Sequence, residues 1–193
     1  MLTAAAKDTT DASIIERSWQ DTAAFALLYD RHAVQLYRYA QRRLGADIAQ
    51  EVVAETFLAA FAGRTRYDLD RPDARPWLYG ILTREIAGHY RRETARLRTL
   101  ARYAPDPPAE GPADRVASGV SARAARQQLA AALAKLNAGE RDVLLLYAWG
   151  DLSYDEIANA LHIPGGTVRS RLSRARRKLR KALQIDPTEA VEE

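Results

Sequence analysis

The chain has 193 residues, which is enough for one ordinary domain or two small ones, and it contains no cysteine. Disulfide bonds, thiolate metal sites and a cysteine nucleophile are therefore excluded. Lysine and arginine number 29 against 25 acidic residues, so the net charge of +4 is informative only through its distribution along the chain. Alanine, leucine and arginine are abundant and β-branched runs are scarce, a composition that predicts an all-α protein.

The N-terminal part of the chain, residues 1–19, is interpreted as a disordered arm. Residues 1–12 mix alanine and threonine with charged residues and lack the apolar core of a signal peptide. No later window approaches the ~18 uninterrupted apolar residues of a membrane-spanning helix. These features predict a soluble, cytoplasmic protein without membrane insertion.

A first helical domain is predicted over residues 20–104. Apolar residues recur at three- and four-residue steps from Phe25 to Tyr39, which is typical of an amphipathic helix, and Gly45 is expected to end it. His32 lies on the apolar stripe of this helix. We therefore interpret it as a partly buried structural histidine rather than a metal ligand.

A second helix, expected to start near Asp47, carries a row of carboxylates. Asp47, Glu51 and Glu55 are four residues apart, so they share one helix face, away from the apolar anchors of the same helix. Such a row is commonly just a solvated surface. The residues alone leave open whether this one binds a partner.

The segment 63–76 is predicted to be a loop because it is charged and contains two prolines. A third helix is expected to begin near Trp77. Three of its arginines, Arg84, Arg91 and Arg98, are seven residues apart and therefore form one basic stripe. The aromatic residues close to this stripe are Tyr67, Trp77 and Tyr90.

Residues 105–120 are predicted to be a flexible, proline-rich linker. Positions 105–119 hold four prolines and two glycines and show no apolar periodicity. Fifteen residues can span up to about 50 Å, so two compact domains could sit far apart on one partner. At the other end of the chain, residues 186–193 form a short acidic tail.

A second helical domain is predicted over residues 121–185. Asn137 with Glu140, and Ser153 with Glu156, are spaced as capping boxes that open two helices. The second of these helices is short, and the residues that follow it predict a tight turn and then a final helix. This arrangement is a helix-turn-helix.

The final helix has the most informative sequence. The turn before it is expected at residues 162–166, with Thr167 as the helix cap. Apolar residues at steps of four, three and four point one side of the helix to the core, while eight cations and no acid lie between Arg169 and Lys181. A basic rod that follows such a turn has the shape of a helix that enters the major groove of DNA.

These two blocks, in this order, resemble the extracytoplasmic-function (ECF) subfamily of bacterial RNA polymerase sigma factors. The resemblance in the first block lies in residues 25–29, 49–57, 77–81 and 90–92. In the second block it lies in residues 140–146, 153–158 and 166–176. It implies two small helical domains, a bundle like sigma region 2 and a helix-turn-helix like sigma region 4, joined by the linker.

The resemblance also assigns roles to the faces described above. The residues that it implies for binding core RNA polymerase are Asp47, Gln50, Glu51 and Glu55. Those implied for recognition and melting of the −10 promoter element are Tyr67, Trp77, Arg84, Arg91 and Arg92. Those implied for reading base edges of the −35 element are Arg169, Ser170, Ser173 and Arg174. The residues expected to hold phosphates there are Thr167, Arg171, Arg176 and Arg177.

The function that this resemblance implies is promoter-specific initiation of transcription, with core RNA polymerase and promoter DNA as partners and an anti-sigma factor as a further one. No catalytic role, cofactor, metal or small-molecule substrate is expected. Arg84 and Gly88 stand where the family commonly has Asn and Asp, so the −10 sequence preference does not carry over. The alternative is a free-standing helix-turn-helix transcriptional regulator.

Overall fold

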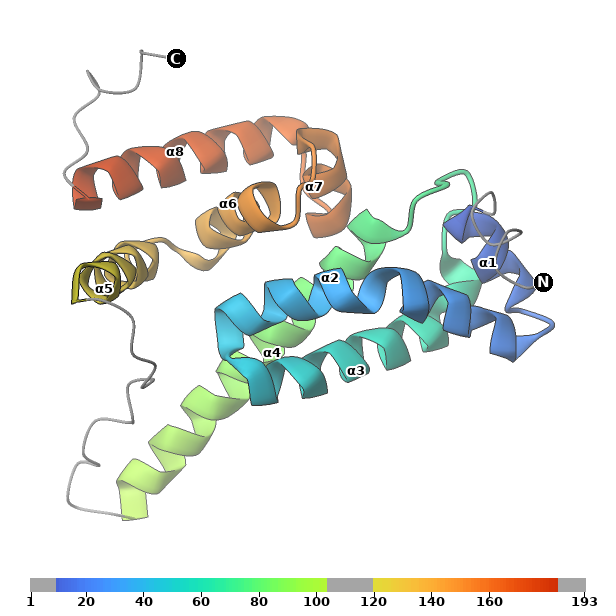
Figure 1. Cartoon of the computed structure of the whole chain (residues 1–193), viewed down its shortest axis with the longest axis horizontal. Coiled ribbons are helices and arrows are strands. Elements are labelled where there is room, and N and C mark those ends of the chain that lie inside the picture. Colours follow the sequence, from blue (N-terminus) through green and yellow to red (C-terminus); the bar gives the residue numbers. More distant parts are fainter. Residues whose placement is uncertain (1–9, 104–119, 184–193) are drawn as a thin grey trace.

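The computed structural model describes residues 10–103 and 120–183, and every regular element within these ranges is helical (Figure 1). The first domain consists of α1 (Asp11–Arg17), α2 (Ala26–Leu44), α3 (Ala46–Gly63) and α4 (Arg75–Tyr103), with short 3₁₀ turns at Thr22–Phe25 and Arg64–Arg66. The second consists of α5 (Val120–Ala134), α6 (Ala138–Trp149), α7 (Tyr154–Leu161) and α8 (Gly165–Leu183). The predicted all-α, two-domain fold is confirmed.

The first domain is built around three long helices, α2, α3 and α4, that pack on one another (Figure 1). Gly45 separates α2 from α3, and its φ of 84° lies in the left-handed region where glycine carries no Cβ penalty. The expected helix end at Gly45 is therefore confirmed. The third helix starts at Arg75, two residues before the predicted Trp77.

The expectation of a disordered arm over residues 1–19 is wrong for residues 10–19, which belong to the first domain. The Thr10 side chain caps α1 by accepting a hydrogen bond from the backbone of Ser13. Ile14 and Ile15 are completely buried, and removing these apolar side chains from water is what orders the segment. Residues 1–9 lie outside the described part of the chain.

A buried carboxylate ties this first helix to the rest of the domain. Asp11 accepts hydrogen bonds from His32 Nε2 (2.7 Å), Arg31 Nη1 (3.0 Å) and the backbone nitrogen of Ala74 (3.0 Å). The other ring nitrogen of His32 accepts from Gln35 Nε2 at 2.7 Å, so the Nε2–H tautomer satisfies both contacts. His32 is 7% exposed, and its predicted structural role is confirmed.

We expect Asp11→Asn to lower the free energy of unfolding by about 2 kcal/mol at pH 7, because the buried network loses its negative charge and one of its two acceptor oxygens. Burial raises the pKa of Asp11, but the contacts to His32, Ala74 and Arg31 outweigh this effect and hold the pKa below its ordinary value of 3.8. A depressed carboxyl pKa stabilises the fold fully above pH 3.8, and this contribution is lost as the pH falls through the folded-state value.

Urea unfolding followed by circular dichroism at pH 7 and at pH 3 measures this effect. The difference between wild type and Asp11→Asn should shrink at the lower pH. Asp30→Asn, on the exposed face of α2, is the matched control and should leave stability unchanged at both values. Equal stability of wild type and Asp11→Asn at pH 7 would contradict the assignment.

The second domain begins its helices as the capping patterns predict. Both capping boxes are complete: Asn137 and Glu140 open α6, and Ser153 and Glu156 open α7, each pair exchanging side-chain and backbone hydrogen bonds. His162 ends α7 in the left-handed conformation (φ 52°), as expected for a turn residue. These contacts fix the helix-turn-helix locally.

One prediction for the last helix needs correction. Thr167 was expected to cap it, but α8 already begins at Gly165, and Thr167 lies in its first turn. The backbone nitrogen of Thr167 donates to the carbonyl of Pro164 at 2.8 Å, so Pro164 sits immediately before the helix and starts it. Proline has a fixed φ that is compatible with the start of a helix. An interpretation based on the capping side chain of threonine alone does not take this into account.

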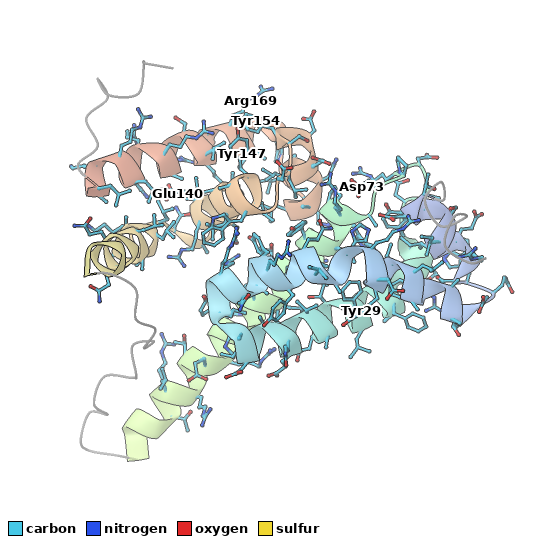
Figure 2. The ribbon with its side chains drawn as sticks, viewed as in Figure 1. Tyr29, Asp73, Glu140, Tyr147, Tyr154 and Arg169 are labelled. Atoms are coloured by element: carbon cyan, nitrogen blue, oxygen red, sulfur yellow. The ribbon has the colours of Figure 1, made fainter. Side chains whose placement is uncertain are left out.

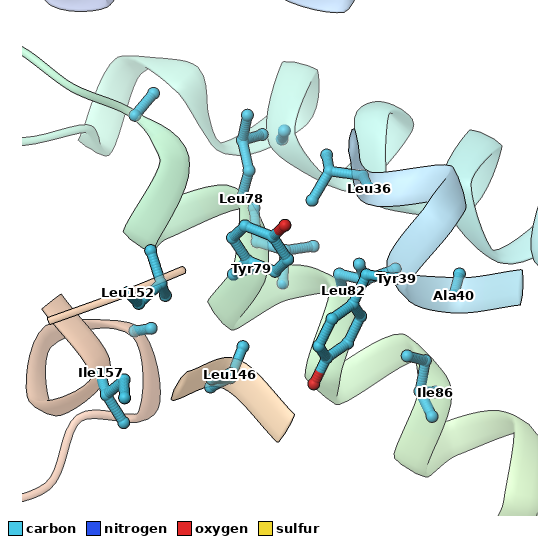
Figure 3. Packing of buried hydrophobic residues seen from close by; sticks show 14 of the residues in the cluster. Leu36, Tyr39, Ala40, Leu78, Tyr79, Leu82, Ile86, Leu146, Leu152 and Ile157 are labelled. Carbon is cyan, nitrogen blue, oxygen red and sulfur yellow. The ribbon is translucent and has the colours of Figure 1, made fainter. Parts of the chain in front are cut away.

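The two domains lie against each other and share one hydrophobic core (Figures 1 and 3). Helix α4 of the first domain packs on α7 of the second. The predicted linker and acidic tail fall mainly on residues 104–119 and 184–193, outside the described residues. Within the described ranges, none of the helices has an apolar stretch long enough to cross a membrane.

Candidate nucleic-acid interface

The outer face of α8 is basic and exposed. Val168, Leu172 and Ala175 are buried against the other helices of the second domain, which turns the opposite side of α8 to solvent. The predicted base-reading residues on this side are all exposed: Arg169, Ser170, Ser173 and Arg174. Figure 2 shows Arg169 on the side of α8 that faces away from the first domain. A straight, cationic helix face is thus available to a polyanion.

One flank of α8 is anchored by Glu140, the residue that also caps α6. Lys178 Nζ donates to Glu140 Oε2 at 2.7 Å, and Arg174 Nε lies 3.8 Å from Oε1. The hydrogen bond from Lys178, together with that from the backbone of Asn137 and the charge of Arg174, holds the pKa of the Glu140 carboxyl below its ordinary value. Glu140 therefore stays ionised and fixes the position of α8 on α6.

Two other arginines of α8 contact the protein at the edges of the basic face. The guanidinium of Arg176 lies 5.1 Å from the ring centroid of Tyr147, a cation–π contact, and Tyr147 also packs on Tyr154 (Figure 2). Arg171 is half-buried, and its guanidinium group lies next to Gly139. Arg177 is exposed, while Thr167 is half-buried in the first turn of the helix.

The loop before α4 is held by Tyr67, the residue predicted to contact the −10 element. Its ring is 7% exposed and packs on Trp77 with centroids 4.9 Å apart. Its hydroxyl donates to the carbonyls of Arg71 (2.7 Å) and Asp73 (3.2 Å), and burial raises its pKa above the ordinary value. Tyr67 thus fixes the loop conformation, while Trp77 stays half-buried at the edge of a cavity.

This cavity has a volume of about 580 Å³ and lies between the two domains. The first domain contributes Tyr67, Trp77 and Arg84 to its wall, and the second contributes the end of α7 and the turn that follows. Arg84 is exposed on α4. Arg66, Asp68, Arg71 and Asp73 also line the cavity, so its wall combines the half-buried Trp77 ring with charges of both signs. The indole ring and the guanidinium groups suit an unpaired base and its phosphate, whereas the two carboxylates do not attract phosphate.

The remaining two arginines predicted at the −10 element lie further along α4. Arg91 and Arg92 are both exposed, and Arg92 Nη2 lies 3.4 Å from Glu55 Oε2 on α3. Next to them, the Tyr90 hydroxyl donates to the carbonyl of Arg43 at 2.9 Å and pins α4 to the end of α2. Arg84, Arg91 and Arg92 of α4 are therefore exposed to solvent, and Glu55 neutralises part of their charge.

The polar row on α3 is exposed at Asp47, Gln50 and Glu51 and half-buried at Glu55, and one helical turn beyond its end lies an apolar residue that the sequence interpretation missed. Asp47, Gln50 and Glu51 are exposed, and Leu58 on the same face is 69% exposed. Leu58 lies on a different face of α3 from the buried apolar residues. An apolar residue out of step with the helical repeat is the sequence signal that could have identified it as exposed. Tyr29 of α2, labelled in Figure 2, is 49% exposed, and its ring packs against that of Phe57 with centroids 4.8 Å apart.

Comparison with known proteins decides the family. The family described as "Sigma-70 region 2" matches residues 28–96, and that described as "Sigma-70, region 4" matches residues 126–179. The ECF RNA polymerase sigma factor SigL of Mycobacterium tuberculosis is 37% identical over 166 residues, which are 85% of this chain and 91% of SigL. The chain belongs to the ECF sigma factors. The RNA polymerase sigma factor CnrH of Cupriavidus metallidurans is also similar, with 34% identity over 84% of this chain and 88% of its own length.

Two solved sigma factors have the fold of this one. The structure of CnrH in complex with the cytosolic domain of CnrY superimposes with a TM-score of 0.63 at 28% identity, covering 91% of this sigma factor and 98% of that chain. RpoE of Bartonella quintana, in complex with the anti-sigma factor NepR, gives 0.56 at 25% identity, covering 78% and 91%. The predicted membership of the ECF sigma factors is thus confirmed.

Proposed function

We propose that this sigma factor binds core RNA polymerase in the cytoplasm and directs it to promoters through a −10 and a −35 element. The observation that carries the proposal is the outer face of α8, where Arg169, Arg174 and Arg177 are exposed on a helix whose other side is buried. A duplex read in its major groove needs such a face. The chain itself supplies recognition and positioning, and the polymerase supplies the chemistry.

The −35 element is read by α8 as intact duplex. Arg169, Ser170, Ser173 and Arg174 contact base edges, since arginine pairs with guanine and serine with several bases. Thr167, Arg171, Arg176 and Arg177 hold the flanking phosphates. The contact of Arg176 with Tyr147 supports this division, because it places Arg176 at the edge of the basic face. Arg174 lies 3.8 Å from Glu140 but stays half-exposed, so its guanidinium group is accessible to DNA.

The −10 element is opened and held by the first domain. The exposed guanidinium groups of Arg84, Arg91 and Arg92 attract the phosphates of the strand, and the half-buried Trp77 offers a ring for stacking. Stacking returns about 1–3 kcal/mol per base, which offsets the few kcal/mol needed to unstack it. Tyr67 contributes by fixing the loop that forms the wall of this site.

Core polymerase is held by the exposed face of α3. Asp47, Gln50, Glu51 and Glu55 provide the polar contacts of this face, and Leu58 provides an apolar anchor at its C-terminal end. An exposed leucine that follows a row of acids suits a protein partner with an apolar pocket next to a basic rim. An anti-sigma factor is a further partner of this sigma factor, as NepR is of RpoE.

The test is transcription in vitro with purified core polymerase on genomic fragments, followed by mapping of the RNA start sites. We expect initiation from a defined set of promoters that core alone does not use. A free-standing regulator, the competing function, would bind promoter duplex tightly without polymerase and would not be retained by immobilised core. Failure to start RNA from any template would contradict the proposal.

A further inference from the structure

Glu140 is an acidic residue that is buried against the basic helix α8. Its side chain is only 3% exposed, and it lies between α6 and α8 (Figure 2). A glutamate is almost never buried to this extent unless its charge is paired. Both ion pairs that α8 forms within the described ranges end at Glu140, one from Lys178 and one from Arg174. A buried anion thus faces two cations of the helix that is assigned to DNA.

The backbone around Glu140 is held in place by neighbouring contacts. Glu140 Oε2 accepts a hydrogen bond from the backbone nitrogen of Asn137 at 3.2 Å, and the Asn137 side chain accepts from the backbone of Glu140 at 2.9 Å. The adjacent Arg141 donates to the carbonyls of Leu133 and Leu136, at the end of α5 and just beyond it, at 3.1 and 2.9 Å. A carboxylate on such a rigid element can position the groups that bind to it.

The two carboxylate oxygens of Glu140 have different partners. Oε2 accepts from Lys178 Nζ at 2.7 Å as well as from Asn137, so both of its lone pairs are used by the fold. Oε1 faces Arg174, whose Nε lies 3.8 Å away, an ion pair longer than a hydrogen bond. The hydrogen bond from Lys178 holds the pKa of the Glu140 carboxyl below its ordinary value. The charge that faces Arg174 therefore persists at neutral pH.

Arg174 extends from this anchor to the outer face of α8. Its side chain is 51% exposed, and its Nη2 lies 3.5 Å from the hydroxyl oxygen of Ser170, an exposed residue one helical turn earlier. The Nε edge of the guanidinium group thus faces the buried carboxylate, and its Nη2 end faces the exposed side. Because the guanidinium group is planar and rigid, an anchor at Nε fixes the direction of the Nη donors.

We propose that Glu140 is a positioning residue, which holds Arg174 by its Nε edge so that the Nη groups read a guanine of the −35 element. The inference rests on the proposed function, in which Arg174 contacts a base edge. Guanine fits because its major-groove edge presents two acceptors, N7 and O6, to one guanidinium group. An arginine that is ordered before binding loses less conformational freedom in the complex. Glu140 thereby favours the correct duplex without touching DNA.

Glu140→Gln is the decisive variant. Glutamine keeps the length of the side chain and can still serve in the capping box, but it lacks the charge that attracts Arg174. Lys178→Met is the matched control, because it removes the other cation at Glu140 and leaves the pair with Arg174 in place. Both variants lose the ion pair between Glu140 and Lys178, so they would behave alike if Glu140 only anchored α8 on α6. Circular dichroism and urea unfolding check that each variant is folded.

Fluorescence anisotropy with a duplex carrying the mapped −35 element and with a scrambled duplex gives the ratio of the two affinities. We expect Glu140→Gln to reduce this ratio about three- to tenfold, the effect of having to order one long side chain on binding. Lys178→Met should keep the wild-type ratio. In an Arg174→Ala background, Glu140→Gln should not reduce the ratio further, because the residue through which it acts is absent.

Three results would overturn the positioning role: an unchanged ratio in Glu140→Gln, an equal reduction in Lys178→Met, or a full reduction in the Arg174→Ala background. Replacing each G·C pair of the −35 duplex by A·T in turn tests the base. One replacement should abolish the effects of both Arg174→Ala and Glu140→Gln on affinity for the −35 duplex. If no guanine behaved in this way, Arg174 would not read guanine.

The order of the Arg174 side chain can also be measured without DNA. The heteronuclear NOE of the Arg174 Nε–H group in ¹H–¹⁵N spectra reports its motion on the ps–ns timescale. We expect this group to be more mobile in Glu140→Gln than in wild type and Lys178→Met, and equal mobility in all three would contradict the proposal. Failure of wild type to initiate transcription with core polymerase would instead reject the proposed function, and the NOE would still decide whether Glu140 holds Arg174.

Discussion

Replacing Glu51 with lysine should weaken the binding of this sigma factor to core RNA polymerase by about ten- to a hundredfold, which corresponds to about 1.4–2.7 kcal/mol. Glu51 is exposed at the centre of the acidic row on α3, so the substitution places a cation opposite the proposed basic rim of the polymerase. Glu55 is the poorer choice, because it already pairs with Arg92 and its loss would also disturb α4. Titration of labelled sigma factor with core polymerase measures the change.

The matched control is Glu16→Lys, which makes the same change in net charge on the exposed side of α1. It should retain wild-type affinity, whereas a general electrostatic effect would weaken both variants equally. Leu58→Ala provides an independent check of the same surface, since it removes an exposed apolar anchor without changing charge. If Glu51→Lys bound core polymerase with wild-type affinity, α3 would not be part of the interface with the polymerase.

Features that depend on near neighbours in the sequence were predictable. The capping boxes at Asn137 and Ser153 each need only a partner three residues away, and both are present. The end of α2 at Gly45 follows from glycine's tolerance of positive φ. The basic face of α8 follows from helical periodicity, because three buried apolar residues determine which side of the helix is exposed.

Features that depend on distant contacts were not predictable in the same way. Asp11 meets His32 and Ala74 only after the chain has folded back, so the contacts that hold residues 10–19 on the domain could not be seen in the sequence, although the cap of Thr10 on Ser13 is local. The resemblance implies that Tyr67 takes part at the −10 element, but the residue is buried, and its hydroxyl donates to two carbonyls of its own loop, which it supports. Periodicity also cannot reveal the approach of Gly80 to Ala160, because these residues belong to different domains.

We expect Arg174→Ala to lower affinity for duplex carrying the mapped −35 element by about 1–3 kcal/mol, or roughly 5- to 150-fold, if its guanidinium group reads a base. The side chain is half-exposed, and its Nη2 lies 3.5 Å from Ser170 Oγ, so both residues occupy one point on the outer face. The substitution leaves the fold intact, because Glu140 keeps Lys178 as its partner at 2.7 Å. Fluorescence anisotropy with the −35 duplex and with a scrambled duplex measures both affinities.

Arg177→Ala separates the two kinds of contact on this helix. Arg177 is exposed and assigned to a phosphate, so its loss should weaken both duplexes equally and reduce the slope of log affinity against log salt by about one. Arg174→Ala should instead reduce the ratio between the two affinities, because a base contact contributes only on the correct sequence. If Arg174→Ala weakened the scrambled duplex as much as the −35 duplex, Arg174 would be a phosphate contact, and base reading would fall to Arg169, Ser170 and Ser173.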